Sequence, residues 1–170
     1  ITAEQFLAEY WQKKPRHPFH AAIYHGGQLW PQTEGIKLFD EGELVPVCSP
    51  KLAASGDWQK LVHLHMSTRP DSWSDWYRSA GLEPDLRVSS GPRYELFSLV
   101  MAALHADMGV ALMPRFLVQQ ALEQGELIMP LDYAMPVSEA YFFSYPTANE
   151  PSEAVLLLEQ WLLEYQKENT

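Results

Sequence analysis

A chain of 170 residues with 46% hydrophobic and 20% charged residues has the composition of a folded globular protein rather than of a disordered segment. Its formal net charge of −10 argues against direct binding to nucleic-acid phosphates, which requires a basic face. Apolar runs such as "VLLL" are too short to cross a bilayer, and the amino-terminal "ITAEQFLAEYWQKKP" lacks the apolar centre of a signal peptide. The single cysteine excludes an intramolecular disulfide and favours a reducing, cytoplasmic compartment.

The amino-terminal half of the chain alternates helix and strand patterns. Apolar residues at helical spacing predict a helix over residues 3–14, and "HAAIYHGG" predicts a strand that two glycines end. The stretch "GIKLFDEGELVPVCSP" predicts two strands on either side of a turn at residues 40–42. Ser49 followed by Pro50 has the residues of a helix start, and the next apolar strand is expected at about residues 61–66.

The same alternation continues through the middle of the chain. Ser72 with Asp75 resembles a capping box, and "WSDWYRSAG" predicts a helix closed by Gly81. The stretch "DLRVSS" at residues 85–90 predicts a strand. The clearest helix pattern is "YELFSLVMAALHADMG", closed by Gly109, and "GVALMPRFLV" then predicts a strand that runs into a helix.

The carboxyl-terminal part adds one more strand and one more helix. "EAYFFSYP" predicts the strand, and Pro151 precedes a helix with Val155, Leu158, Leu162 and Tyr165 on one face. Strands and helices therefore alternate through most of the chain. This alternation predicts the α/β class, with a sheet whose strands are joined by crossover connections.

The sequence contains none of the short motifs that mark the common catalytic and nucleotide-binding sites. It has no G-x-S-x-G, no G-x-x-x-x-G-K-[ST] and no G-x-G-x-x-G. His63 and His65 face the same side of a predicted strand, but no third ligand completes a metal site, so a hydrogen-bonded pair is the simpler interpretation. Cys48 in "VPVCS" is interpreted as a buried apolar residue rather than a nucleophile. We therefore expect no enzyme, no metal and no cofactor.

Polar residues collect where three of the predicted strands end. In open α/β sheets, ligands bind beyond the carboxyl ends of strands, where helix amino termini carry positive partial charge. The loops are "YHGG", "MSTRPDSW" with the hydroxyls of Ser67 and Thr68, and "SSGPRY", which ends at Tyr94. Arg69, just before a predicted helix, is a candidate carboxylate clamp. Helix capping explains any one of these loops, but the three together favour a small polar or anionic ligand.

Four longer stretches of the chain follow one another in a characteristic order. The first is "AAIYHGGQLWPQTEGIKLFDEGELVPVCSPKL", and the second is "LVHLHMSTRPDSWSDWYRSAGLEP". The third is "LFSLVMAALHADMGVALMPRFLVQQALEQGELIMPL", and the fourth is "AYFFSYPTANEPSEAVLLLEQWL". In this order they resemble the effector-binding domain of LysR-type transcriptional regulators, in the branch similar to the glycine-cleavage regulator. The third stretch resembles the family's most recognisable segment, and the fourth its closing strand and helix. The resemblance covers nearly everything after about residue 20.

The resemblance implies two Rossmann-like lobes of the type II periplasmic-binding-protein kind, joined by two crossing strands. Lobe one would combine residues 1–46 with 141–170 and would be incomplete, because the family's first strand and the loop after it have no counterpart here. Lobe two would comprise residues 47–140. A small-molecule effector in the cleft between the lobes would modulate DNA binding and transcription. The domain would form a homodimer or homotetramer and reach DNA only through a winged helix-turn-helix that this chain lacks.

The family's cleft positions, carried onto this chain, complete the expected effector-binding site. They lie at the end of a lobe-one strand, at the first crossing and in the loop before a lobe-two helix: Tyr24, His25, Cys48, Ser49, Thr68, Arg69, Asp71, Ser72 and Trp73. With Ser67 and Tyr94 from the loop pattern, these residues form the predicted site. His25 stands where relatives often place a basic residue, which would make ligand affinity sensitive to pH near neutrality.

Two other functions are compatible with the same two-lobed fold. A solute-binding protein of a transporter would require an export signal. An enzyme such as a deaminase or synthase would require a lysine, a serine or paired carboxylates converging on the cleft. Lys37 and Lys51 are expected to face solvent, so the sequence favours the regulatory sensor.

Overall fold

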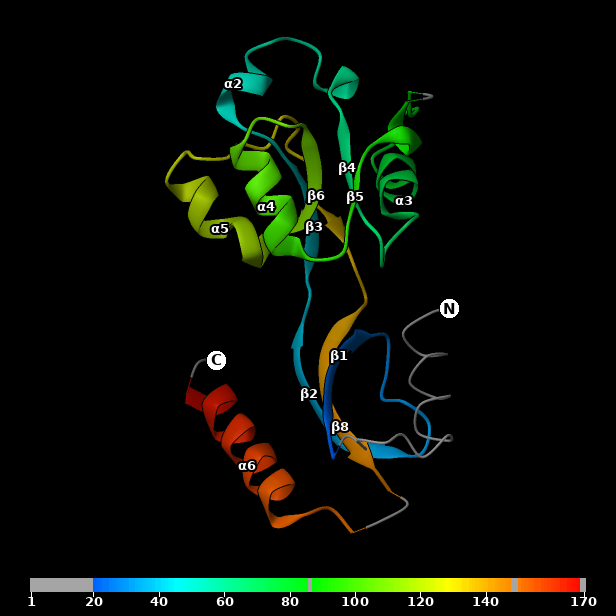
Figure 1. Ribbon diagram of the computed structural model, residues 1–170, viewed down its shortest axis with the longest axis vertical. Helices are drawn as coiled ribbons and strands as arrows, with labels where there is room; N and C mark the ends of the chain where they lie inside the picture. Colours follow the sequence, from blue (N-terminus) through cyan, green and yellow to red (C-terminus); the bar gives the residue numbers. More distant parts are fainter. Residues whose placement is uncertain (1–19, 86, 148–149, 169–170) are drawn as a thin grey trace. The chain divides into compact units, whose positions relative to one another are not determined.

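The computed structural model describes residues 20–85, 87–147 and 150–168, which belong to two units (Figure 1). The first unit combines residues 1–41 with 138–170, and the second comprises residues 42–137. The chain enters the second unit at residue 42, five residues before the expected start at residue 47, because β3 (Glu43–Val47) pairs entirely within the second unit's sheet. The chain returns to the first unit at residue 138, whereas the expected return was at residue 141.

The second unit is built on a mixed five-stranded sheet. Its strand order is β5 (Arg93–Tyr94), β4 (His63–Met66), β6 (Val110–Pro114), β3 and β7 (Met135–Pro136). β4 is parallel to both β5 and β6, whereas β3 is antiparallel to β6 and β7. The carboxyl ends of β4, β5 and β6 therefore share one edge of the sheet, which we call the carboxyl edge, and β3 ends at the opposite edge.

Helices cover both faces of this sheet. Figure 1 shows α3 (Ser72–Ser79) on one face, and α4 (Phe97–His105) and α5 (Arg115–Glu123) on the other. Because successive side chains of a strand point to opposite faces, each strand supplies both cores. Leu64 and Met66 of β4 pack in the core under α4 and α5, while Val110 and Leu112 of β6 pack in the core that contains α3. The predicted α/β class is confirmed.

Three short helical segments complete the second unit: α2 (Pro50–Ala53), η1 (Trp58–Lys60) and η2 (Val88–Ser90). The predicted helix start is confirmed, since Ser49 caps α2 by accepting a bond from the Leu52 amide and Pro50 is the first helical residue. The strand expected at residues 85–90 is wrong. The Asp85 carboxylate accepts bonds from the Arg87 backbone amide and guanidinium, and this local bonding favours the tight η2 turn over an extended strand.

The ends of α3 and α4 differ from their predicted caps. Asp71, not Ser72, is the residue that precedes the first turn of α3, and Asp75 pairs with Arg78 at 2.8 Å, so the expected capping box does not form. Gly81 does follow α3 with a positive φ of 68°, as predicted. After α4 the positive φ belongs to Asp107, at 57°, and not to the expected Gly109.

Gly109 instead allows the start of β6 to approach the chain just before β4 closely. A Cβ atom at this position would overlap the backbone carbonyl oxygen of Val62, and the Val110 amide donates to that same oxygen at 2.9 Å. The glycine therefore allows β6 to start directly beside β4.

The described part of the first unit is a three-stranded antiparallel sheet with one helix against it. The strand order is β1 (Ala22–Gly26), β8 (Ala140–Pro146) and β2 (Thr33–Asp40), and α6 (Glu153–Glu168) packs against β2. The strands predicted in "HAAIYHGG" and "EAYFFSYP" are confirmed. The helix predicted over residues 3–14 lies outside the described residues.

The helix α6 turns partly polar residues toward the sheet. Glu159 accepts a bond from the Tyr145 hydroxyl at 3.1 Å, and the Gln166 amide donates to backbone carbonyls of β2. Of the face predicted as apolar core, Val155 is buried, but Leu158 and Tyr165 are exposed. The predicted face is therefore wrong in part, since polar side chains, Glu159 and Gln166, also contact the sheet.

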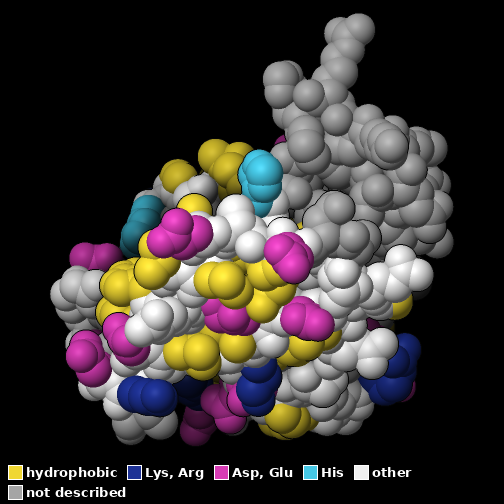
Figure 2. All heavy atoms as spheres, turned by 90° about the horizontal axis from the view of Figure 1, so that it is seen from below, with side chains coloured by type: hydrophobic (Ala, Val, Ile, Leu, Met, Phe, Trp, Pro, Cys, Tyr) yellow, Lys and Arg dark blue, Asp and Glu magenta, His cyan; other side chains and the backbone are white. Residues whose placement is uncertain are grey.

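Exposed apolar side chains are a general feature of α6, where Leu157, Trp161 and Tyr165 form an outward row. Figure 2 shows one face of the molecule on which hydrophobic side chains lie between acidic ones. Among the described helices, none has the length and apolar composition that a membrane span needs.

We expect Gly109→Ala to destabilise the chain, because the new methyl group would overlap the Val62 carbonyl oxygen. Overpacking of this kind costs about 1–3 kcal/mol. Urea unfolding of Gly109→Ala and of the control Gly27→Ala, whose Cβ would meet nothing within 4 Å, measures the difference. Equal unfolding midpoints for the two variants would contradict the close approach of β4 and β6.

Candidate functional site

The candidate site lies at the carboxyl end of β4, where the chain changes direction across the sheet. From β4 the chain runs through α3 to β5 on one side, and then through α4 to β6 on the other side. Because α3 follows β4 and α4 follows the adjacent strand β5, and the two helices lie on opposite faces, the two connections diverge between the carboxyl ends of β4 and β5. Open α/β sheets bind their ligands at such a switch point.

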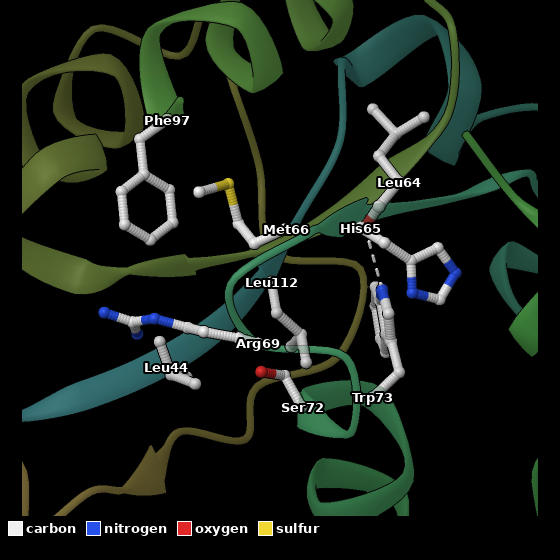
Figure 3. Close-up of a pocket in the computed structure, with 9 residues that line it drawn as sticks. All are labelled: Leu44, Leu64, His65, Met66, Arg69, Ser72, Trp73, Phe97 and Leu112. Carbon is white, nitrogen blue, oxygen red and sulfur yellow. Dashed lines mark hydrogen bonds between the residues drawn. The ribbon is translucent and has the colours of Figure 1, made fainter. Parts of the chain in front are cut away.

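A small pocket occupies this position, within the second unit (Figure 3). It contains about 280 Å³ of space not filled by atoms, part of it open to solvent. Its lining residues come from β3, β4, β6, α3, α4 and the loop after β4: Leu44, Leu64, His65, Met66, Arg69, Ser72, Trp73, Phe97 and Leu112. The lining therefore draws on residues from both faces of the sheet.

Arg69 is held at the pocket by the turn that follows β4. The Arg69 amide donates to the Met66 carbonyl at 3.0 Å, which closes this turn. The guanidinium carbon lies 5.1 Å from the centre of the Phe97 ring, a cation–π distance. Figure 3 shows Arg69 and Phe97 on the same side of the pocket. The arrangement places a permanent positive charge beside an aromatic face.

Trp73 and Ser72 line the pocket from the first turn of α3. The Trp73 indole is 2% exposed, and its Nε1 donates to the Leu64 carbonyl of β4 at 3.0 Å. This bond fixes the first turn of α3 against the strand. Ser72 is the first residue of α3, so it stands at the positive end of the helix dipole.

His65 lines the pocket as a neutral side chain. Burial lowers the pKa of His65, and its Nε2 donates to the Val88 carbonyl at 2.8 Å. His63, two residues earlier, faces the same way: its Nδ1 donates to the Leu61 carbonyl, and its Nε2 accepts from the Tyr77 hydroxyl, both at 2.9 Å. Burial lowers the pKa of His63 to about 4. Both imidazoles are thus bonded to protein groups, and no cluster of three metal-ligating side chains occurs within the part of the chain that the structure describes.

The other residues predicted on the lobe-two loops lie around the pocket rather than in it. Ser67, Thr68 and Asp71 are exposed on the loop between β4 and α3. Tyr94 is half-buried at the end of β5, where its carbonyl accepts a bond from the Ser67 amide at 2.8 Å. Of the predicted lobe-two set, the structure therefore brings Arg69, Ser72 and Trp73 together.

Cys48 and Ser49 lie at the opposite edge of the sheet. They follow β3, which is antiparallel to β6, so they come next to the start of β6 and not to its end. Cys48 is fully buried in the core that contains α3, and burial raises the pKa of its thiol. Ser49 caps α2 and donates to the Asp107 carboxylate at 2.5 Å. These contacts give both residues structural roles at a distance from the pocket.

Tyr24 and His25 belong to the first unit. Tyr24 is buried, stacks on Trp30 with ring centres 3.6 Å apart, and accepts a bond from the Trp30 amide at 2.9 Å. The Nε2 atom of His25 lies 2.8 Å from the carboxylate of Glu41, which is 3% exposed. Tyr24 thus has a packing role, and His25 forms an ion pair when it is protonated.

Sequence reasoning missed the apolar part of the pocket. These lining residues are Leu44, Leu64, Met66, Phe97 and Leu112, together with His65. In the sequence, each looks like an ordinary core residue of a strand or helix. The usable signal is position, because Met66 and Phe97 stand at the end of a strand and at the start of a helix, directly beside the predicted loops.

Comparison with known proteins identifies relatives over most of the chain. The family model described as "LysR substrate binding domain" matches residues 13–167. The chain is 29% identical over 153 residues to the carbapenem-hydrolyzing beta-lactamase transcriptional activator of Enterobacter cloacae, covering 87% of this chain and 50% of that protein. It is 30% identical over 147 residues to the transcriptional activator AmpR of Pseudomonas aeruginosa, covering 84% and 49%. The chain thus spans about half the length of the curated relatives that it matches.

Solved structures show the same fold. The effector domain of AmpR from Pseudomonas aeruginosa matches with a TM-score of 0.73 and 26% identity, over 88% of this chain and 73% of that one. The AmpR effector-binding domain from Citrobacter freundii matches with a TM-score of 0.73 and 21% identity, over 88% and 75%. The regulatory domain of HypT from Salmonella typhimurium matches with a TM-score of 0.70 and 16% identity, over 99% and 80%. At their lower identities, the last two show the fold alone.

We expect His63 to make the stability of the chain fall as the pH drops from about 6.5 toward 4. In this window the unfolded chain takes up a proton that the buried imidazole does not, because burial lowers the folded pKa from 6.5 to about 4. The difference corresponds to about 3 kcal/mol of unfolding free energy. Urea unfolding measures the free energy of unfolding at pH 7 and at pH 4. The decrease between these two pH values should be smaller by this amount in His63→Gln than in the native chain.

An NMR titration of the native chain gives the same information without a substitution. The ring signals of His63 should keep their neutral shifts down to about pH 5, as expected for a pKa near 4. Titration of His63 near pH 6.5 would show that the imidazole is not desolvated as described.

Proposed function

This chain belongs to the family of LysR substrate-binding domains, and on that basis we propose that it is the ligand-sensing part of a LysR-type transcriptional regulator. The observation that carries the proposal is the pocket at the end of β4, where Arg69, Ser72 and Trp73 converge on a position that α/β sheets use for ligands. The chain has the α/β fold of effector-binding domains, which is of the type II periplasmic-binding-protein kind. The narrower resemblance to the glycine-cleavage-regulator branch stays a prediction.

The proposed effector is a small polar or anionic molecule that binds at the pocket. A ligand changes the equilibrium between two arrangements of a protein only by its difference in affinity for them. We propose that the effector acts in this way on the regulator, and that DNA is contacted by a winged helix-turn-helix outside this chain. The net charge of −10 supports a separate DNA-binding part.

The remaining parts of this proposal come from the family resemblance. The regulator would act in the cytoplasm as a homodimer or homotetramer. The two lobes of the family would correspond to the two units of the structure. Tyr24 and His25, in the first lobe, would contact the effector. Cys48 and Ser49 are left out of the proposed site, because they lie at the other edge of the sheet.

The two alternative functions are less well supported. The relatives are transcriptional regulators, so the domain is regulatory and not an enzyme. The same comparisons give no support to a transporter's solute-binding protein.

A thermal-shift screen of the chain against small metabolites tests the proposal. Amino acids, aromatic acids and dicarboxylic acids are screened with the native chain, with Arg69→Ala and with Arg78→Ala, whose exposed side chain lies on α3 and does not line the pocket. An effector at 100 times its Kd should stabilise the native chain and the Arg78→Ala control by about 2.7 kcal/mol, and should stabilise Arg69→Ala much less.

The other outcomes separate the parts of the proposal. A ligand that stabilises all three proteins equally would support sensing and would contradict the site at Arg69. Failure of every metabolite class to stabilise the native chain would contradict the sensing function of this chain.

A further inference from the structure

The exposed side of α6 carries residues at the spacing that is typical of paired helices. We propose that this side binds the same side of α6 in a second copy of the chain, with the two helices antiparallel. The inference rests on the homodimer of the proposed function and names the surface at which its two chains meet. Three observations carry it: the spacing and exposure of the residues, the order of their sizes, and the charges at the two ends of the helix.

Four exposed residues of α6 follow one another at intervals of four, three and four positions. We call them the α6 seam: Ala154, Leu158, Trp161 and Tyr165. This alternation keeps side chains on one side of a helix and is the pattern of the seam between two paired helices. Leu157 widens the seam and is 59% exposed. The contact of α6 with its own sheet uses another side of the helix, where Val155 is buried.

The α6 seam is uncharged, although the chain has a net charge of −10. The acidic residues and the lysine of this helix all lie outside the seam. Trp161 is 57% exposed, and its ring centre lies 5.7 Å from that of Tyr165, so these two members are neighbours on the surface. Contiguous apolar surface of this kind marks an interaction site. Two copies of the chain can meet here without burying a charge of either.

The sizes of the side chains along the seam match an antiparallel copy. The seam begins with the small Ala154 and ends with the large Tyr165. In an antiparallel pair whose two-fold axis passes between residues 159 and 160, Ala154 of each copy faces Tyr165 of the other. Leu158 of each copy then faces Trp161 of the other. A parallel pair would instead set two tyrosines against each other and leave a gap between two alanines, which close packing disfavours.

Charges at the two ends of α6 favour the same orientation. The first turn of the helix carries Glu153, and the last turn carries Lys167. In the antiparallel pair, Glu153 of each copy comes beside Lys167 of the other, so opposite charges meet at both ends. Glu168 comes beside the amino terminus of the other helix, where the helix dipole favours an acid. A parallel pair would bring like charges together at each end.

Sedimentation equilibrium of the native chain, over a wide range of concentrations, tests the proposal. We expect a monomer–dimer equilibrium. Trp161→Glu should weaken the dimer at least about tenfold, because it sets two like charges beside the two-fold axis. The matched control is Leu99→Glu, which places the same charge on α4 at a side chain that is 49% exposed, and it should dimerise like the native chain. Melting temperatures establish that each variant is folded.

A charge exchange tests the orientation of the two helices. Glu153→Lys and Lys167→Glu should each weaken the dimer by about fivefold at low salt, since each replaces two exposed ion pairs with two like-charge contacts. The double variant restores opposite charges and should dimerise more tightly than either single variant. Both substitutions also oppose the helix dipole. If fraying of α6 caused the weakening, the double variant would therefore be the weakest of the three.

The other outcomes separate the surface from the homodimer. A dimer that Leu99→Glu dissociates and Trp161→Glu does not would overturn the α6 surface and leave the homodimer standing. A double charge variant that dimerises no better than the single variants would overturn the antiparallel pairing. A chain that is monomeric at every concentration would contradict both the surface and the homodimer. Ligand sensing is measured separately, by the thermal-shift screen.

Discussion

The burial of β4 on both faces is the constraint on which the arrangement of the second unit depends. All four of its side chains are buried, including the two imidazoles. His63 and His65 satisfy that constraint by remaining neutral and bonding to Tyr77 and to the Val88 carbonyl. The strand is thereby bound to α3 and η2 on one side, and Leu64 and Met66 pack under α4 and α5 on the other. Its carboxyl end is a fixed support for the loop that carries Arg69.

Much of the fold could be predicted because local patterns determine it. Short apolar runs for the strands, helical spacing of apolar residues for the helices, and glycine or proline boundaries were enough to place β1, β6, β8, α4 and α5. The pattern failed at residues 85–90, where the Asp85 carboxylate competes for the backbone of Arg87. It failed also at α6, because contacts such as those of Glu159 and Gln166 with the sheet cannot be read from the helix alone.

The candidate site was partly predictable for the same reason. Arg69, Ser72 and Trp73 are polar or conspicuous residues next to a strand end, and the structure places all three at the pocket. Local patterns could not show that Cys48 and Ser49 lie away from the pocket. Their position depends on the direction of β3, which is set by its antiparallel pairing with β6, a strand far away in the sequence. The apolar lining was missed because a leucine that lines a pocket and a leucine in a core have the same local pattern.

The reversed direction of β3 has a consequence for how such a domain can diversify. One edge of the sheet carries the cap and ion-pair contacts of Ser49, Lys51 and Asp107, while the other carries the exposed loop between β4 and α3. Changes in that loop can alter what is recognised without disturbing the contacts at the far edge. Proteins that share this fold could thus acquire a new ligand specificity by a few substitutions at the carboxyl edge. The residues that stabilise the opposite edge of the sheet would evolve independently of that change.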